Sequence, residues 1–274
     1  MIKGLYASAS GMLAGMNRQV ALSHNVSNAD TPGFKQLLVT MNDYMQTAAY
    51  PQLVQSSPLI PVYTGNLPPV LPDYLERLGL NRLRKQGDLG LGVETSSPIV
   101  DFSQGALQTT NIMTDVALDG EGFFHVRTPD GDYYTRDGRF GRDATGQLVT
   151  SQGYLVLDVN NQPITVPEGE MVIGTDGTIT VNGANVAQIG VVAFADPRTD
   201  LLRENNGLYS AINAPDATIP VGQVHQGFLE MSNVNAAQVM TQLISVTRSY
   251  EANQQLVRVQ DDLLGRAIGS LGKG

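Results

Sequence analysis

The amino-acid sequence predicts an α+β protein: long N- and C-terminal helices pair as a coiled-coil-like stem, with a mostly antiparallel β domain between them. Three observations predict this fold class. Both ends of the chain repeat apolar residues at helical spacing, and the middle repeats glycine-containing turns at intervals of seven or eight residues. In addition, 42% of the 274 residues are hydrophobic, which is enough to form a packed core.

The N-terminal segment carries two stripes at helical spacing, so we expect a helix over residues 3–28. The apolar stripe is flanked by Leu13 and Val20 and consists of Ile2, Leu5, Ala9, Met12 and Met16. Beside it runs a stripe of small residues, Gly4, Ser8, Gly11 and Gly15. Small residues at this spacing allow another backbone to approach closely. The alternative is an ordinary amphipathic helix that tolerates three glycines, each costing about 0.5–1 kcal/mol.

The C-terminal segment gives the stronger helical signal, and we expect a helix over residues 235–270. No glycine or proline occurs from Phe228 to Leu264, and Asn235 with Gln238 forms a possible N-terminal capping pair. Nine of eleven positions in one heptad phase are apolar: Ala236, Val239, Leu243, Val246, Tyr250, Asn253, Val257, Gln260, Leu264, Ala267 and Leu271. A helix this long, about 54 Å, must bury its stripe against a partner, and the N-terminal helix is the obvious candidate. Asn253 and Gln260 interrupt the stripe, through either partial exposure or specification of register.

The sequence of the middle of the chain predicts a series of β-hairpins. Turn signals occur at Asp130-Gly131, Asp137-Gly138, Thr145-Gly146 and Gln152-Gly153, and again at Asp176-Gly177 and Asn182-Gly183, with short apolar runs between them. Six of the fourteen prolines fall between residues 36 and 97. We therefore divide the chain into a terminal helical assembly domain (1–35 and 228–274), an extended Pro-rich linker region (36–97) and a β domain (98–227).

Charge follows the same division. The chain has 17 basic and 26 acidic residues, a net charge of −9, and this acidity disfavours nucleic-acid binding. Residues 1–45 and 228–274 together carry 7 basic and 6 acidic residues, whereas residues 46–227 carry 10 and 20. We expect no membrane span, because the longest apolar runs fall far short of roughly 20 residues. Small and polar residues interrupt the N-terminal apolar segment, which argues against a cleaved signal peptide.

The sequence offers no constellation for catalysis. Cysteine is absent and the three histidines, His24, His125 and His225, are isolated, so we predict no catalytic, cofactor-binding or metal-binding residue. Gly120-Glu121-Gly122 is followed by aromatic residues, which favours a turn before a strand over a phosphate loop. We expect a protein that is not an enzyme.

Three stretches carry a resemblance. The segment Asn25-Val-Ser-Asn-Ala-Asp-Thr-Pro-Gly-Phe-Lys35, and the segment from Gln226 to Asn235 with its following helix, resemble the terminal signatures of bacterial flagellar rod and hook proteins. The segments from Asp119 to Phe124, from Tyr134 to Gly138 and around Gly153-Tyr154 resemble the β domain of the rod subgroup. The residues matching the signatures are Asn25, Asn28, Thr31, Pro32, Gly33, Phe34, Ser232, Asn233 and Asn235. In the first signature Pro32 and Gly33 are expected to end the helix.

The resemblance implies a structural axial subunit of the flagellar basal-body rod, distal or proximal, which self-assembles and transmits torque from motor to hook. It implies export without a cleaved signal peptide to the basal body outside the cytoplasmic membrane. The implied partners are further copies of the chain, other rod and hook proteins and the surrounding rings. We expect the assembly interface to use Leu5, Met12, Met16, Val239, Leu243, Val246, Tyr250, Val257 and Leu264, with close packing at Gly4, Gly11 and Gly15.

Two alternatives of other classes remain open at this point. The first is a secreted adhesin or glycan-binding β protein with helical oligomerisation ends. The second is a cell-wall hydrolase, for which two carboxylates would be enough.

Overall fold

The computed structural model describes residues 2–43, 93–95 and 98–271. Most of the expected Pro-rich linker region, 36–97, therefore lies outside the described residues. The described chain forms two compact units, which are considered separately. Of the described residues, the first contains 2–19, 39–43, 93–95 and 245–271, and the second contains 20–38 and 98–244. This division cuts both long helices, whereas the boundaries expected from sequence fall at residues 35 and 228.

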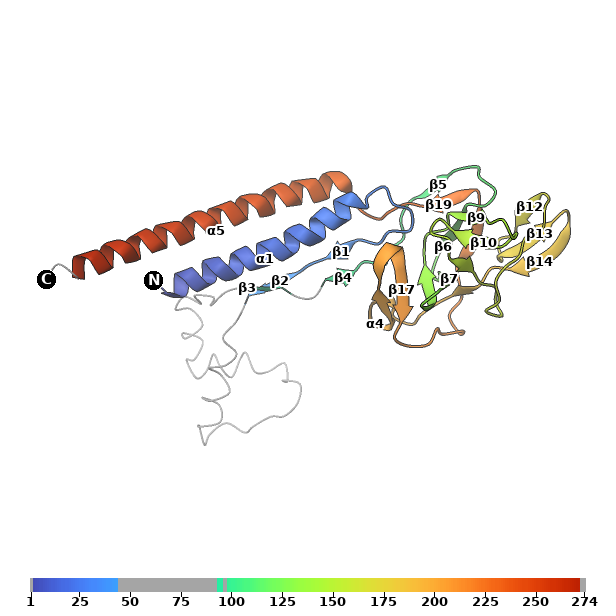
Figure 1. Ribbon diagram of the computed structural model, residues 1–274, viewed down its shortest axis with the longest axis horizontal. Coiled ribbons are helices and arrows are strands. Elements are labelled where there is room, and N and C mark those ends of the chain that lie inside the picture. The colour runs from blue at the N-terminus through green and yellow to red at the C-terminus, as the bar shows by residue number, and fades with distance from the viewer. Residues whose placement is uncertain (1, 44–92, 96–97, 272–274) are drawn as a thin grey trace, which may run out of the picture. The chain divides into compact units, whose positions relative to one another are not determined.

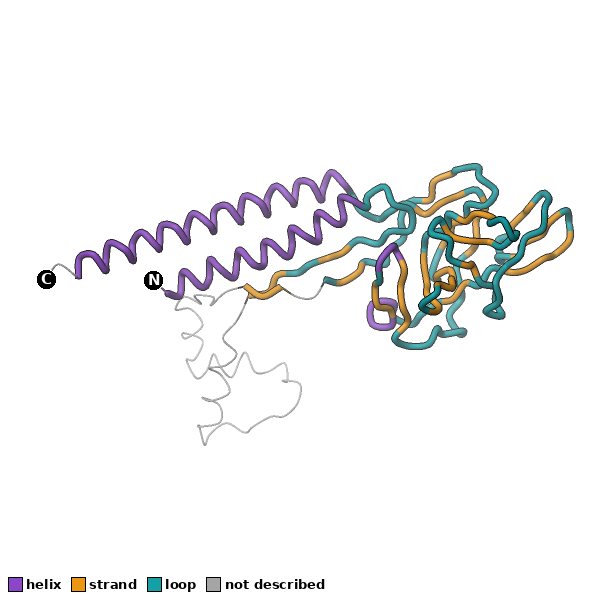
Figure 2. The backbone as a smooth tube through the Cα atoms, viewed as in Figure 1, coloured by secondary structure: helices purple, strands orange, loops and turns teal. Residues whose placement is uncertain are grey.

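The two long helices are α1 (Ile2–Ser27) and α5 (Ala236–Leu271), drawn in purple in Figure 2. Their bounds agree closely with the predicted ranges. The capping pair of α5 is also present, because the backbone N–H of Gln238 donates to the Asn235 side-chain oxygen at 3.1 Å. At the end of α1 the Asn28 side chain donates to the His24 carbonyl at 2.8 Å, and the chain then turns through Thr31-Pro32-Gly33.

The first unit contains the outer parts of α1 and α5 and a short antiparallel pair, β2 (Met41–Asp43) with β3 (Val93–Thr95). Within this unit the 2–19 part of α1 and the 245–271 part of α5 run side by side (Figure 1). The contacts between them are antiparallel and are described with the site below.

The second unit is a β domain in which every described strand pairing is antiparallel, as predicted. Its main sheet has eight strands, in the order β16-β17-β8-β7-β11-β10-β9 with β15 added to β7. These strands are β7 (Phe123–Thr128), β8 (Gly131–Thr135), β9 (Phe140–Arg142), β10 (Leu148–Thr150), β11 (Leu155–Val156), β15 (Val191–Val192), β16 (Leu201–Arg203) and β17 (Leu208–Ala211). A short helix, α4 (Pro197–Asp200), precedes β16.

Smaller pairings complete this unit. A three-stranded sheet contains β12 (Met171–Ile173), β13 (Thr178–Val181) and β14 (Ala184–Gln188). Three two-stranded pairs join distant segments: β1 (Leu37–Leu38) with β4 (Ile99–Val100), β5 (Leu107–Thr109) with β19 (Phe228–Glu230), and β6 (Val116–Asp119) with β18 (Gln223–Gln226). The last two bring residues 223–230, which precede α5, against the start of the β domain.

Most of the predicted glycine turns connect two strands that are hydrogen-bonded to each other. The turns at 130–131, 145–146, 152–153, 176–177 and 182–183 each connect two paired strands. Asp137-Gly138 is the exception, since β8 and β9 do not pair with each other. Gly138 instead passes directly beside the backbone of Val116, where an added Cβ would collide with the Val116 carbonyl oxygen. Glycine is therefore required at position 138 because two backbone segments approach closely there, and not because the chain forms a hairpin turn.

The core of the β domain is apolar and lies between the main and the three-stranded sheets. One cluster includes Phe124, Val126, Leu148, Val156 and Ile179, all essentially inaccessible to solvent. A second cluster is aromatic and packs Phe123, Tyr134, Phe194 and Tyr209 with Leu201. Burial of this apolar surface is the main favourable contribution to folding of the unit.

Candidate assembly site

The predicted heptad stripe of α5 is the covered face of the helix. Val239 and Val246 are buried, and the other positions from Ala236 to Leu264 in that phase are at least half-buried: Ala236, Leu243, Tyr250, Asn253, Val257, Gln260 and Leu264. The side chains of Ala267 and Leu271 lie outside the described set. A single chain therefore already shields this stripe from water.

On α1 the buried residues are mostly small. Ser8, Ala14, Gly15 and Ala21 are buried, and Leu22, at 5% exposed, is the larger apolar residue among them. Of the larger apolar residues, Met16 is 56% exposed, and Leu13 and Val20 are more exposed still. Met12 and Ala9 are half-buried, and the structure does not describe the side chains of Ile2 and Leu5. Met16 therefore takes no part in the face that is covered within this chain.

Two glycines of α1 lie against the two polar residues that interrupt the α5 stripe. An added Cβ at Gly4 would lie 2.6 Å from Nε2 of Gln260, and one at Gly11 would lie 3.0 Å from Nδ2 of Asn253. Each helix advances by seven residues between these contacts, in opposite directions, which is an antiparallel register with heptad spacing. Gly15 differs, because an added Cβ would meet no described atom within 4 Å.

Both helices also present large apolar side chains to solvent. On α1 they fall at intervals of seven, with one residue between: Tyr6, Leu13, Met16 and Val20. On α5 they form one group near the start of the helix and a second group in its C-terminal half: Met240 and Ile244, then Leu256, Val259 and Leu263. Concentrations of exposed apolar side chains at helical spacing are uncommon on monomeric proteins and mark interaction surfaces.

The end of α1 is held by an asparagine of the first signature. Asn25 is fully buried, its side-chain oxygen accepts the Leu37 N–H at 2.8 Å, and its amide donates to the Leu37 carbonyl at 2.7 Å. The side chain thus replaces a strand partner for Leu37 and fixes the direction of the chain after the helix. Only an amide offers both a donor and an acceptor in this geometry.

A buried ion cluster connects the two signatures. Lys35 and Glu230 are each 1% exposed, and Nζ of Lys35 donates to Oε1 of Glu230 at 2.6 Å. The same Glu230 oxygen accepts the Gly105 N–H at 2.9 Å, while its other oxygen accepts from the Arg136 guanidinium at 3.1 Å. Burial lowers the pKa of Lys35, and the carboxylate of Glu230 opposes that shift.

Backbone contacts reinforce the same junction. The Gly33 N–H donates to the Glu230 carbonyl at 2.7 Å, and Gly33 has φ of 69°. An added Cβ there would collide with the Arg136–Asp137 peptide, so both the conformation and the space require glycine. Asn233 accepts the Gln36 N–H at 2.8 Å and donates to the Asp101 carbonyl at 2.9 Å.

The other signature residues support this junction locally. The Thr31 hydroxyl lies 3.4 Å from the Asn28 side-chain oxygen, and the Ser232 hydroxyl accepts the Val234 N–H at 3.2 Å. Pro32 is half-buried, and Phe34 is buried with its ring centroid 5.5 Å from that of His24. The structure therefore brings residues of both signatures together in the second unit.

Sequence reasoning did not single out Lys35, Glu230 and Arg136 as site residues. Lys35 and Glu230 are separated by 195 positions, so no local pattern links them. The available signal was a lone cation ending the first signature and a lone carboxylate inside the second. Opposite charges in two segments that are expected to meet could have suggested the pair.

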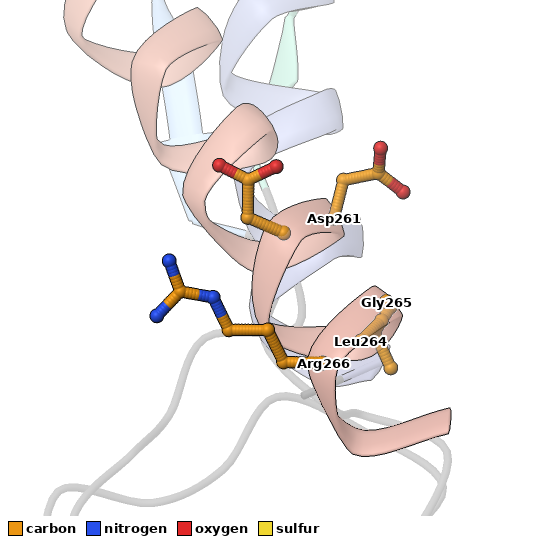
Figure 3. A pocket seen from close by; sticks show the side chains of 5 residues that line it. Asp261, Leu264, Gly265 and Arg266 are labelled. Atoms are coloured by element: carbon orange, nitrogen blue, oxygen red, sulfur yellow. The ribbon is translucent and has the colours of Figure 1, made fainter. Parts of the chain in front are cut away.

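The described residues contain no group of three or more histidine, cysteine, aspartate or glutamate side chains that could hold a metal ion. A shallow hollow of about 680 Å³ lies on α5, lined by Asp261, Asp262, Leu264, Gly265 and Arg266. The labelled Asp261 and Arg266 side chains point in different directions there (Figure 3), so they do not converge on a ligand. Nor is any helix in the described ranges long and apolar enough to cross a membrane.

A chain with a β domain between two long helices in sequence, exposed apolar stripes on those helices and a buried junction has the features of a structural protein with assembly surfaces. Comparison with known families agrees. A basal-body rod protein family matches residues 5–35, the D1 domain of the flagellar hook protein FlgE/F/G matches residues 117–181, and the C-terminal family of FlgEFG rod proteins matches residues 225–270.

Known proteins align along almost the whole chain. The flagellar basal-body rod protein FlgG of Borreliella burgdorferi is 31% identical over 97% of this chain and 98% of its own length. FlgG of Bacillus subtilis is 32% identical over 98% of both chains, and FlgF of Rhizobium meliloti is 33% identical over 99% of both. The chain belongs to the flagellar basal-body rod protein family and is a structural rod subunit. The adhesin alternative finds no support among these relatives.

Proposed function

We propose that this subunit self-assembles through its terminal segments, residues 1–35 and 228–274, and that α1 and α5 pair in each subunit as an antiparallel coiled coil. Residues 36–97 then connect this assembly domain to the β domain, residues 98–227. One observation carries the proposal. Each helix has one face covered within the chain and a second apolar stripe left in water, so a subunit is complete in itself yet has surface to bury against neighbours.

The covered face has a structural role in this proposal. Val239, Leu243, Val246, Tyr250, Val257 and Leu264 hold α5 against α1, and Gly4 and Gly11 allow the two backbones to approach. Leu5, Met12 and Met16 complete the assembly interface in this proposal, and the exposed Met16 side chain is available to a neighbouring subunit. Gly15 leaves open space in the single chain, which a neighbouring side chain fills on assembly.

The exposed stripes supply the free energy of assembly. Full burial of one large apolar side chain is worth about 1.5–3 kcal/mol, whereas association costs on the order of 4–15 kcal/mol in lost freedom. Nine such side chains on the two helices are between 49% and 67% exposed, so burying what remains of them recovers about half of that value each, and together they offset a cost of this size. The near balance of charge in the terminal segments limits repulsion between copies.

The partners follow from the same arrangement. Further copies, and other axial proteins of the rod and hook with similar termini, pack against the helices. The acidic β domain is available to the surrounding rings of the basal body. The subunit reaches that place outside the cytoplasmic membrane by export without a cleaved signal peptide, and the rod transmits torque from motor to hook.

The test compares two variants, one with an aspartate in the exposed apolar stripe of α5 and one with an aspartate at a neighbouring polar position. Leu256→Asp should leave the helix content of the dilute subunit unchanged, because this side chain is about half exposed. It should raise the critical concentration for assembly by about a hundredfold or more, since an unpaired carboxylate would be buried between subunits. Gln255→Asp, at an exposed polar position next to it, is the control. Sedimentation and electron microscopy measure assembly, and normal rods from Leu256→Asp would refute the proposed interface.

A further inference from the structure

A cavity of about 800 Å³ in the second unit is not used by the junction described above. Its wall includes His24 at the end of α1, Pro32 and Phe34 of the first signature, and the connection between β16 and β17 from Glu204 to Gly207. The same wall carries two arginines, Arg139 and Arg203. The two differ in what they contact.

Arg203 is a half-buried cation that forms no ion pair with any residue in the described part of the chain. Its guanidinium carbon lies 4.6 Å from the centroid of the Phe34 ring, and its Nη1 atom is buried with no hydrogen-bond partner among the residues that the structure describes. Burial lowers the pKa of this arginine, which means that its charge is poorly solvated. A stacked guanidinium with an N–H that has no partner is well suited to donate hydrogen bonds to a carboxylate.

The carboxylates of the cavity wall are already engaged elsewhere. Asp137 accepts from the Arg139 guanidinium at 3.1 and 2.9 Å, and Glu204 accepts from the Ser210 hydroxyl at 3.1 Å. Neither forms an ion pair with Arg203 in the described structure. By contrast, the other buried arginine of this unit, Arg136, is paired with Glu230 at 3.1 Å. The wall of the cavity therefore includes one arginine that has no ion-pair partner among the described residues.

We infer that this cavity receives an aspartate or glutamate side chain from a neighbouring copy of the chain, which pairs with Arg203. The inference rests on the proposed self-assembly and adds a specific polar contact to it. The chain has 26 acidic and 17 basic residues, so each copy brings carboxylates in excess of its own cations. The cavity is also far larger than a small inorganic anion requires, which favours an occupant carried by a protein segment.

The first experiment compares two glutamine substitutions in the full chain. Arg203→Gln should raise the critical concentration for assembly about tenfold, because a charge-assisted hydrogen bond is lost. Arg198→Gln, on an exposed arginine of α4, should assemble like the parent protein. Circular dichroism of the dilute subunits checks that both variants fold. Parent-like assembly by Arg203→Gln would overturn the inference, whereas a parent chain that does not assemble would contradict the proposed self-assembly itself.

The second experiment identifies the occupant and does not depend on a loss of function. Arg203→Lys keeps the positive charge and introduces an amine that a carbodiimide can couple to a neighbouring carboxylate, with loss of water to the reagent. Assemblies are made from a mixture of ¹⁴N- and ¹⁵N-labelled chains and analysed by mass spectrometry. A mixed-isotope link from position 203 to an aspartate or glutamate supports the inference. Links within one chain only, or no links in assembled rods, would overturn it. A separate NMR measurement follows the resonance of His24, which lies in the cavity wall. A resonance that shifts when inorganic phosphate is added but not on assembly would also overturn the inference.

Discussion

Nε2 of Gln260 lies 2.6 Å from the point that a Cβ on Gly4 would occupy, so the polar side chain of α5 fills the space that the glycine of α1 leaves open. Asn253 and Gly11 repeat this arrangement seven residues away in each helix. The polar interruptions of the apolar stripe are thus matched to glycines on the facing helix. Such a match favours one register, because a shift would place an amide against a larger side chain.

Replacing glycines of α1 by alanine should separate helix propensity from close packing. Gly15→Ala should raise the stability of the helix in the dilute subunit by about 0.8–1 kcal/mol, since the new methyl group meets open space. Gly11→Ala should gain less, because Asn253 must move away from a contact of 3.0 Å. Thermal unfolding followed by circular dichroism at the helix band measures both. An equal gain at the two positions would show that Asn253 does not restrict the Gly11 site.

The sequence pattern predicts α5 better than α1, and the reason is physical. On α5 large apolar residues line the covered face, so hydrophobic periodicity identifies Val239 and Val246 correctly. On α1 most of the buried residues are small, such as Ala14, with Leu22 as a larger exception, while Met16 stays exposed. A periodic pattern of large apolar side chains shows which face of a helix can bury hydrophobic surface. Close packing of two helices depends instead on small side chains at their contact. The pair Lys35–Glu230 lies beyond local reasoning altogether, because only the folded chain brings these segments together.

The buried cluster around Glu230 should be far more important to stability than an exposed ion pair. Glu230→Gln should lower the free energy of unfolding of the second unit by about 3–5 kcal/mol, because it leaves the buried charges of Lys35 and Arg136 without their carboxylate. Glu168→Gln is the control, since Glu168 pairs with Arg142 at the surface with 93% of its side chain exposed. That variant should change the free energy by about 1 kcal/mol or less.

Urea unfolding, followed by tyrosine fluorescence because the chain has no tryptophan, gives both values. A double variant, Lys35→Met with Glu230→Gln, should recover part of the loss, since it removes one of the two stranded charges. A small effect of Glu230→Gln alone would contradict the role of this carboxylate in joining the terminal signatures.

Acidification should weaken the β domain through His125. This imidazole is buried, its ring lies 5.0 Å from that of Tyr134, and burial lowers its pKa, although Asp132 at 3.7 Å acts in the opposite direction. In the unfolded chain the group titrates near the usual value of about 6.5. As the pH falls below that value the unfolded state takes up a proton that the folded state does not, so the free energy of unfolding decreases until the folded pKa is reached. The aspartates with lowered pKa values, such as Asp143, lose their contribution only below about pH 4.

The test measures the free energy of unfolding between pH 7 and pH 5, a window about the ordinary histidine pKa. His125→Phe keeps a ring against Tyr134 but cannot titrate, so its stability should fall less steeply with acid than that of the parent chain. Tyr134→Phe keeps the imidazole and removes only a hydroxyl group, so it should retain the parent slope. His24 shifts in the same direction, mainly through burial, but it is far more exposed and contributes a smaller part. If His125→Phe and Tyr134→Phe gave the same slope, the acid sensitivity would have to come from groups other than His125.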